Sequence, residues 1–293
     1  MKKFLAVLGV LCFLSPVTGA RAADDADAQA LSGDDLYEAS QDVRQKHEQM
    51  LYPTVLVRGG DSSTGSGTVI FSDQYEGEWV SLILTNWHVV RGSINVAKEW
   101  DSQRQEKVEK EVRRPVHVDL WDYNNYSEAI GTIGRRALIV AWDKDLDLAL
   151  LQIQDKERPL PYVAALYPED EDDGPWIFQQ VFAVGAGLGK PPFPTEGLLA
   201  GFGRDKNGKG LWMATAPIVF GNSGGALFVS SPRDTFELIG VPSMISAYGW
   251  GNIVTHMAWS RPIPEIRSFL RNNSYGFVLG DEPVEDEEED SIN

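Results

Sequence analysis

The feature that most restricts the fold of this chain is a series of short β-type runs, separated by glycine, aspartate and asparagine. Six such runs lie between residues 54 and 153, and six more lie between residues 178 and 247. Two sets of this kind favour two β-barrels or sandwiches over an α/β fold. The predicted strands are 54–57, 67–71, 80–85, 116–121, 137–142, 148–153, 178–184, 198–202, 211–214, 226–229, 236–241 and 244–247.

The first 22 residues have the pattern of a secretory signal peptide. Lys2 and Lys3 form a basic start, residues 4–14 are apolar, and Ala20 and Ala22 make an A-x-A cleavage pattern. The apolar run is too short to span a bilayer, so we expect no stable membrane insertion after cleavage. The chain is therefore predicted to be exported, to the periplasm or the medium; the alternative is a retained N-terminal anchor.

Three further segments differ in composition from the β-type runs. Residues 23–50 have apolar positions at helical spacing and predict a helix, with a flexible linker as the alternative. Residues 98–114 carry many charges of both signs, which indicates a surface loop or a short solvated helix. Residues 156–177 are rich in proline and acidic residues, which indicates an exposed connector.

The C-terminal region contains a predicted helix and an acidic tail. The helix covers 263–270, after Pro262 and Pro264, and the tail carries eight carboxylates between residues 281 and 290. Such a run repels itself and buries no apolar surface, so we expect it to be disordered. The predicted organisation is signal peptide 1–22, helical segment 23–50, first β-barrel 51–155, connector 156–177, second β-barrel with its C-terminal helix 178–275, and acidic disordered tail 276–293.

Charge and metal-binding residue types exclude several functions. The chain has 26 Lys and Arg against 43 Asp and Glu, a formal net charge of −17. An acidic surface repels phosphate backbones and anionic lipids, so nucleic acid is not an expected partner. The single cysteine and four scattered histidines do not make a zinc cluster. We therefore predict no metal site and no cofactor.

Three segments contain residue types that together can perform nucleophilic catalysis. His88 ends an apolar strand, Asp147 precedes the run Leu-Ala-Leu-Leu, and Ser223 lies within Gly-Asn-Ser-Gly-Gly. A hydroxyl nucleophile needs an imidazole to accept its proton, and the imidazole needs a carboxylate to fix its tautomer. Asp145 is a rival for the carboxylate, because strand parity places it on the same face as Asp147.

In their order and spacing, these segments resemble the trypsin-like serine peptidases, and within them the HtrA/Deg-like branch. The resemblance covers about residues 50–272 and extends to the entry strand at 53–57, Gly-Ser-Gly at 65–67, Thr-Glu-Gly at 195–197 and Glu-Leu-Ile-Gly at 237–240. It implies an all-β, chymotrypsin-like fold of two antiparallel six-stranded β-barrels, with a short N-terminal helix and a C-terminal helix.

The resemblance also implies a role for each matching residue. His88 is the general base, Asp147 the orienting acid and Ser223 the nucleophile, and the backbone N–H groups of Gly221 and Ser223 form the oxyanion hole. The implied activity is endoproteolysis of polypeptides by a Ser-His-Asp acyl-enzyme mechanism. The substrate-binding positions implied in the same way are Pro217, Ile218, Ser243, Met244 and Ile245.

The sequence departs from the family pattern at three places. Trp87 stands before the histidine, where smaller residues are typical, and is expected to narrow the cleft. Residues 98–114 form an insertion, and the chain after Ser223 is too short to add a PDZ domain to the second barrel. These departures keep open the alternative of a catalytically weak or inactive binding or scaffold protein on a protease fold. The sequence leaves the oligomeric state and the natural substrate open.

Overall fold

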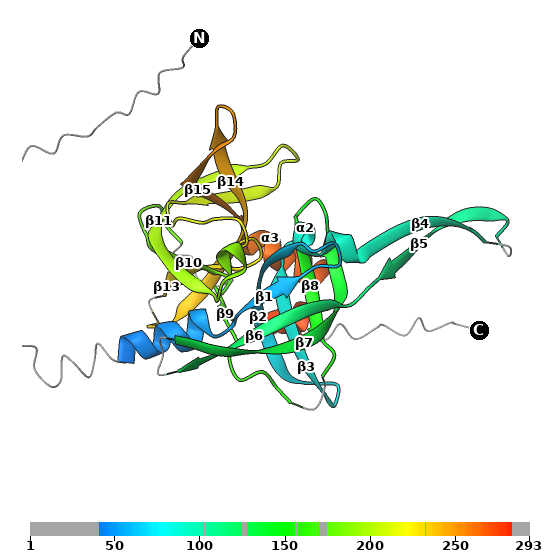
Figure 1. Ribbon diagram of the computed structural model, residues 1–293, viewed down its shortest axis with the longest axis horizontal. Helices are drawn as coiled ribbons and strands as arrows, with labels where there is room; N and C mark the ends of the chain where they lie inside the picture. The colour runs from blue at the N-terminus through cyan, green and yellow to red at the C-terminus, as the bar shows by residue number, and fades with distance from the viewer. Residues whose placement is uncertain are drawn as a thin grey trace, which may run out of the picture. The chain divides into compact units, whose positions relative to one another are not determined.

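The computed structural model describes residues 41–101, 104–124, 128–155, 158–169, 175–231 and 233–282. Within them, six antiparallel strands close into a first barrel, in the order β1-β2-β3-β8-β7-β6 (Figure 1). Its strands are β1 (Thr54–Arg58), β2 (Thr64–Tyr75), β3 (Glu78–Thr85), β6 (Val116–Asn124), β7 (Glu128–Asp143) and β8 (Leu148–Ile153).

A second ring of six antiparallel strands runs β13-β10-β11-β12-β15-β14 and closes through a β13–β14 pairing. The prediction of two six-stranded antiparallel barrels is therefore confirmed. The strands are β10 (Gln180–Gly185), β11 (Phe193–Arg204), β12 (Gly210–Ala214), β13 (Ala226–Ser230), β14 (Phe236–Tyr248) and β15 (Asn252–Pro262).

The helical elements are short. They are η1 (His47–Leu51), which continues a helical stretch over 41–46, then α2 (Trp87–Val90), η2 (Arg91–Ser93), η3 (Gly187–Gly189), α3 (Ile263–Asn272) and η4 (Gly276–Leu279). Among the described residues, no helix combines the length and the apolar character that crossing a membrane requires.

Strand β3 explains why the sequence shows continuous apolar runs instead of a simple alternation. Ile83 faces the interior of the first barrel, where it packs with Val55 and Val69. Its neighbours Leu82 and Leu84 belong to a second core cluster, which also contains residues of β10, β11 and β13. All three side chains are fully buried. A strand with both faces buried carries apolar residues at every position, because successive side chains point to opposite faces.

The predicted strands 236–241 and 244–247 are one continuous strand, β14, so the prediction of two separate strands was wrong. The pairing with β15 shifts register between Pro242 and Met244, which marks a β-bulge. A bulge tolerates proline inside a strand, because the ladder is already interrupted there. Strand β15 itself was missed, since most of its first half is exposed or half-buried and shows no apolar alternation.

Residues 98–114 were predicted to form a loop or a short helix, and this was wrong. They lie mostly in a two-stranded hairpin of β4 (Ile94–Asp101) and β5 (Glu106–Arg113), which extends away from the barrels (Figure 1). Both faces of the hairpin meet solvent over much of its length, so its charges show no alternation. A cross-strand ion pair joins Lys110 to Glu99 at 2.9 Å.

The connector 156–177 was predicted to be exposed, but some of its described residues are buried. It contributes β9 (Ala165–Leu166), which pairs in parallel with β14, and Ala164 and Tyr167 are buried.

Helix α3 begins at Ile263, ahead of Pro264, because proline fits the first helical turn. The predictions for residues 1–22, for 23–40 and for 283–293 lie outside the described residues.

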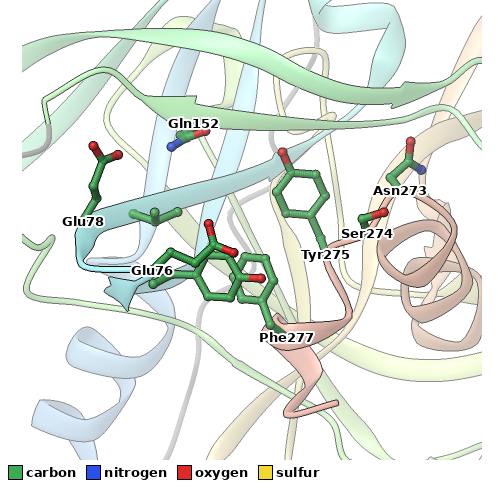
Figure 2. A pocket seen from close by; sticks show the side chains of 9 residues that line it. Glu76, Glu78, Gln152, Asn273, Ser274, Tyr275 and Phe277 are labelled. Atoms are coloured by element: carbon green, nitrogen blue, oxygen red, sulfur yellow. The ribbon is translucent and has the colours of Figure 1, made fainter. Parts of the chain in front are cut away.

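The predicted disordered tail was placed too early, because residues 276–282 have a defined structure. The ring of Phe277 stacks on Tyr75 with centroids 3.9 Å apart and meets Phe71 edge to face. Beside them lies a cavity of about 350 Å³ between the β2–β3 hairpin and the segment after α3. Figure 2 shows Tyr275, Phe277, Glu76 and Glu78 among the side chains that line it.

We expect Phe277→Ala to lower the free energy of unfolding by about 1–3 kcal/mol, since it removes the aromatic contacts with Phe71, Tyr75 and Tyr275 and leaves a void. Urea unfolding followed by tryptophan fluorescence measures this. Phe220→Ala is the matched control, because the Phe220 side chain is 67% exposed. Equal effects of the two substitutions would show that η4 does not hold the C-terminal segment to the barrel.

Candidate active site

His88 is held by Asp147 through both carboxylate oxygens, one bonded to the imidazole ring and the other to the backbone amide. The Nδ1 of His88 lies 2.8 Å from Oδ2 of Asp147, and the backbone N–H of His88 donates to Oδ1 at 2.9 Å. His88 belongs to α2, directly after β3, and Asp147 ends the turn before β8. Because β3 and β8 are neighbours in the first barrel, these two ends meet. This arrangement leaves Nε2 as the ring nitrogen that can accept a proton.

The structure distinguishes Asp147 from its rival Asp145. Residues 144–147 form a turn, not a strand, so parity does not put the two carboxylates on one face. Asp147 has a positive φ of 55°, a conformation that costs an L-residue roughly 1–2 kcal/mol. Asp145 is exposed, and its backbone N–H donates to Oδ1 of Asp143 at 2.8 Å. The structure therefore brings Asp147, and not Asp145, to the imidazole.

The Gly-Asn-Ser-Gly-Gly segment requires glycine at two positions. Gly221 and Gly224 have φ values of +97° and +85°, which favour a residue without Cβ. A Cβ on Gly224 would stand 2.2 Å from the carbonyl oxygen of Ser66 and 2.3 Å from Oγ1 of Thr85. The Gly-Asn-Ser-Gly-Gly turn therefore lies directly against β2 and β3 of the first barrel.

Ser66 of β2 links this turn to the first barrel by hydrogen bonds. Its N–H donates to the carbonyl of Ser223 at 2.7 Å, and its hydroxyl donates to the carbonyl of Gly221 at 2.6 Å. The same hydroxyl accepts a bond from the N–H of Ala186, just after β10, at 2.7 Å. Ser66 is fully buried, so these bonds are shielded from water.

The backbone around Ser223 leaves two N–H groups for an outside acceptor. The amides of Asn222 and Gly224 donate to the carbonyls of Val219 and Pro242. Across the described residues, no acceptor is found for the amides of Gly221 and Ser223. Since backbone N–H groups are normally paired, two unpaired donors in one turn are suited to an anionic oxygen.

The hydroxyl of Ser223 is not hydrogen-bonded to His88 within the part of the chain that the structure describes. His88 is hydrogen-bonded directly to Asp147, and the backbone carbonyl of Ser223 is hydrogen-bonded to Ser66 on β2 of the same barrel as His88. Catalytic hydrogen bonds are often long in structures without substrate and shorten when it binds.

Asn86 connects the two halves of the site and was not assigned a role from sequence. It occupies the N-cap position of α2 but makes no capping bond. Its side-chain amide instead donates to the carbonyl of Asp147 and to the hydroxyl of Ser243, both at 2.8 Å. Ser243 is the extra residue of the β14 bulge, which explains why its hydroxyl turns towards the first barrel.

The five predicted substrate-binding residues differ in position. Pro217 is exposed, and its carbonyl accepts a hydrogen bond from Thr195 at 2.7 Å. Ile218 is 3% exposed and belongs to the core shared by the barrels, so its side chain is not on the surface. Ser243 is bonded to Asn86, Met244 is exposed and Ile245 is half-buried against the core.

Trp87 packs on the first barrel. Its ring lies 6.4 Å from that of Trp142, and the ammonium of Lys144 stands 5.6 Å over it. These contacts account for a large residue before the histidine.

The structure combines two closed β-barrels with a histidine–aspartate pair on the first and a serine in a glycine turn on the second. These features define the chymotrypsin-like class of fold. The family model of the trypsin-like peptidase domain matches residues 65–241, which is more than half of the chain. The chain therefore belongs to the trypsin-like peptidases, and the resemblance found in the sequence is confirmed.

Solved structures of HtrA and Deg proteases have the same fold. The HtrA-type protease AlgW with a tripeptide is similar at 20% identity and a TM-score of 0.54, over 79% of this chain and 64% of that one. A serine endoprotease from Yersinia pestis is similar at 18% identity and a TM-score of 0.52, over 82% of this chain and 67% of that one. Deg5 is similar at 23% identity and a TM-score of 0.53, over 79% of this chain and 93% of that one. This chain thus spans less than two thirds of the AlgW chain. No match is found among curated protein sequences.

Proposed function

We propose that this protein is a serine endopeptidase that hydrolyses polypeptides outside the cytoplasm, with Ser223, His88 and Asp147 as its catalytic residues. The single observation that carries the proposal is the His88–Asp147 pair, bonded through both carboxylate oxygens at 2.8 and 2.9 Å. Membership of the trypsin-like peptidases supports the same reaction.

The proposed mechanism follows from which atoms are bonded and which are free. Oγ of Ser223 attacks the scissile carbonyl carbon while its proton passes to Nε2 of His88. Asp147 stabilises the imidazolium through Nδ1–H, and the N–H groups of Gly221 and Ser223 bind the oxyanion. The imidazolium then protonates the leaving amine, which departs and leaves an acyl-enzyme. Water, deprotonated by His88, hydrolyses the ester and restores Ser223.

The proposed location rests on the leader pattern of residues 1–22. The proposed partners are polypeptide substrates, with no cofactor and no nucleic acid, in keeping with the net charge of −17.

A second candidate function is that of a binding protein on a protease fold. The observation that favours it is the lack of a hydrogen bond between the Ser223 hydroxyl and His88 among the described residues. The two candidates differ in whether Ser223 is nucleophilic, and this can be measured without knowing the substrate.

We expect a fluorophosphonate probe to label the protein, and Ser223→Ala to abolish both labelling and peptide hydrolysis, because the attacking oxygen is lost. The loss in kcat should be at least roughly 10⁴-fold. Intact-protein mass spectrometry measures labelling. Ser274→Ala, at an exposed serine, is the control. A wild-type protein that folds but is not labelled would favour the binding function.

Asp147→Asn should lower kcat/KM by about 10³- to 10⁴-fold, since an amide stabilises the wrong imidazole tautomer. Asp145→Asn is the matched control and should change kcat/KM by less than about two-fold. Steady-state hydrolysis of one peptide by both variants tests this. The reverse order would assign the orienting acid to Asp145.

We propose a preference for small or medium aliphatic residues on the acyl side of the cut bond. By resemblance, Pro217 stands at the floor of that pocket and Ile245 at its entrance, and neither selects a cation. Discrimination should be modest, because a methylene is worth only about 1–3 kcal/mol in such a pocket. A peptide panel that varies this residue measures it. Fastest cleavage after Arg, Lys or Phe would contradict the proposal.

A further inference from the structure

Arg261 is a charged residue inside the protein, close to the acid of the proposed triad. It lies on β15 of the second barrel, and its side chain is only 3% exposed. A buried guanidinium is costly unless its donors are paired. The partners of Arg261 therefore indicate why a charge is kept there.

Two of its nitrogens reach across to the first barrel. Nε donates to the carbonyl of Leu146 at 2.7 Å, and Nη2 makes a longer bond of 3.4 Å to the carbonyl of Asp145. These are the two residues directly before Asp147. Arg261 thus binds the backbone of the turn that presents the carboxylate to His88.

The remaining bonds fix Arg261 within its own barrel. Nη1 donates to the carbonyl of Gly210 at 2.8 Å, and Nη2 lies 3.0 Å from Oδ2 of Asp205. Asp205 is itself held, because its Oδ1 accepts the amides of Asn207 and Lys209. Burial raises the pKa of Asp205, but the hydrogen bonds from Lys209, Arg261 and Asn207 outweigh it, so the net shift is downward and favours the carboxylate.

The turn that Arg261 binds is under conformational strain. Asp147 has a φ of 55°, and a non-glycine residue in this region persists only where its surroundings fix it. From the first barrel, Asp143 accepts the amides of Asp145 and Leu146, and Asn86 binds the carbonyl of Asp147. Arg261 supplies hydrogen bonds to this turn from the second barrel, the barrel that carries Ser223.

We infer that Arg261, held by Asp205, is a positioning residue that fixes Asp147 and therefore the imidazole of His88 relative to Ser223. The inference rests on the proposed peptidase function. It assigns to a second-barrel arginine the task of aligning a first-barrel carboxylate. A purely structural role would change stability without changing the His88–Asp147 hydrogen bond.

The test compares Arg261→Met, Arg261→Lys and Asp205→Asn with wild type. Arg261→Met should lower kcat on a cleaved peptide by about 10- to 100-fold and leave KM within about two-fold, because small displacements of catalytic groups slow the chemical step. The low-field proton NMR resonance of the His88 Nδ1–H should shift or broaden. Arg261→Lys should restore part of kcat, because an ammonium replaces one of the donors.

Arg113→Met is the matched control. Arg113 also donates to two backbone carbonyls of the first barrel, those of Ile139 and Val140. Its removal should leave both kcat and the resonance unchanged. An Arg261→Met protein that is folded by circular dichroism and has wild-type kcat and resonance would overturn the inference.

If Arg261→Met does not fold, Arg261→Lys and Asp205→Asn decide the question. Each should lower kcat by about 3- to 10-fold and perturb the resonance. Wild-type values in both would overturn the inference. If wild type cleaves no peptide, the proposed function fails, while the resonance still tests whether Arg261 positions Asp147.

Discussion

The site depends on the hydrogen bonds that Ser66 makes between the two barrels. Each barrel fixes the register of its own strands, but the pairing inside one barrel does not determine where the other lies. Ser66 meets this requirement by binding the carbonyls of Gly221 and Ser223 at 2.6 and 2.7 Å. Apolar packing between the barrels is strong but non-directional, so it brings them together without setting their alignment. Directional bonds inside that dry contact provide the alignment.

Directional hydrogen bonds also fix the carboxylate of Asp147. Both oxygens of Asp147 are occupied by His88, one by the ring and one by the backbone amide. The bond from the backbone amide fixes the orientation of the carboxylate, so that its other oxygen is directed at the imidazole Nδ1. The cost is a backbone in a left-handed conformation, and the surrounding turn must offset it. Asn86 contributes, since its side chain binds the carbonyl of Asp147 and gives up the cap of α2.

Much of the fold was predictable from sequence, because strands with buried faces have a distinct pattern. The apolar run 148–153 predicted β8 with its observed bounds. Hairpin β4–β5 and the first half of β15 were not predictable in this way, since solvent on their faces removes the apolar signal. At the site, motif spacing identified residue types. It did not identify Ser66, Asn86 or Arg261 as residues that join the two barrels by hydrogen bonds. Most of their hydrogen-bond partners lie more than 60 positions away in the chain, beyond the reach of a local motif.

Arg261 illustrates why a long-range polar contact escapes sequence reading. An arginine near the end of a strand normally indicates a position at the surface. Here its donors are met by three carbonyls and one carboxylate, so the charge is retained at 3% exposure. An apolar side chain of similar volume would avoid the desolvation cost but would leave the carbonyls of Leu146 and Gly210 without this donor. Stability alone therefore gives little reason for a buried arginine, whereas alignment of a turn in the other barrel requires a long side chain whose planar guanidinium carries several donors in a fixed geometry.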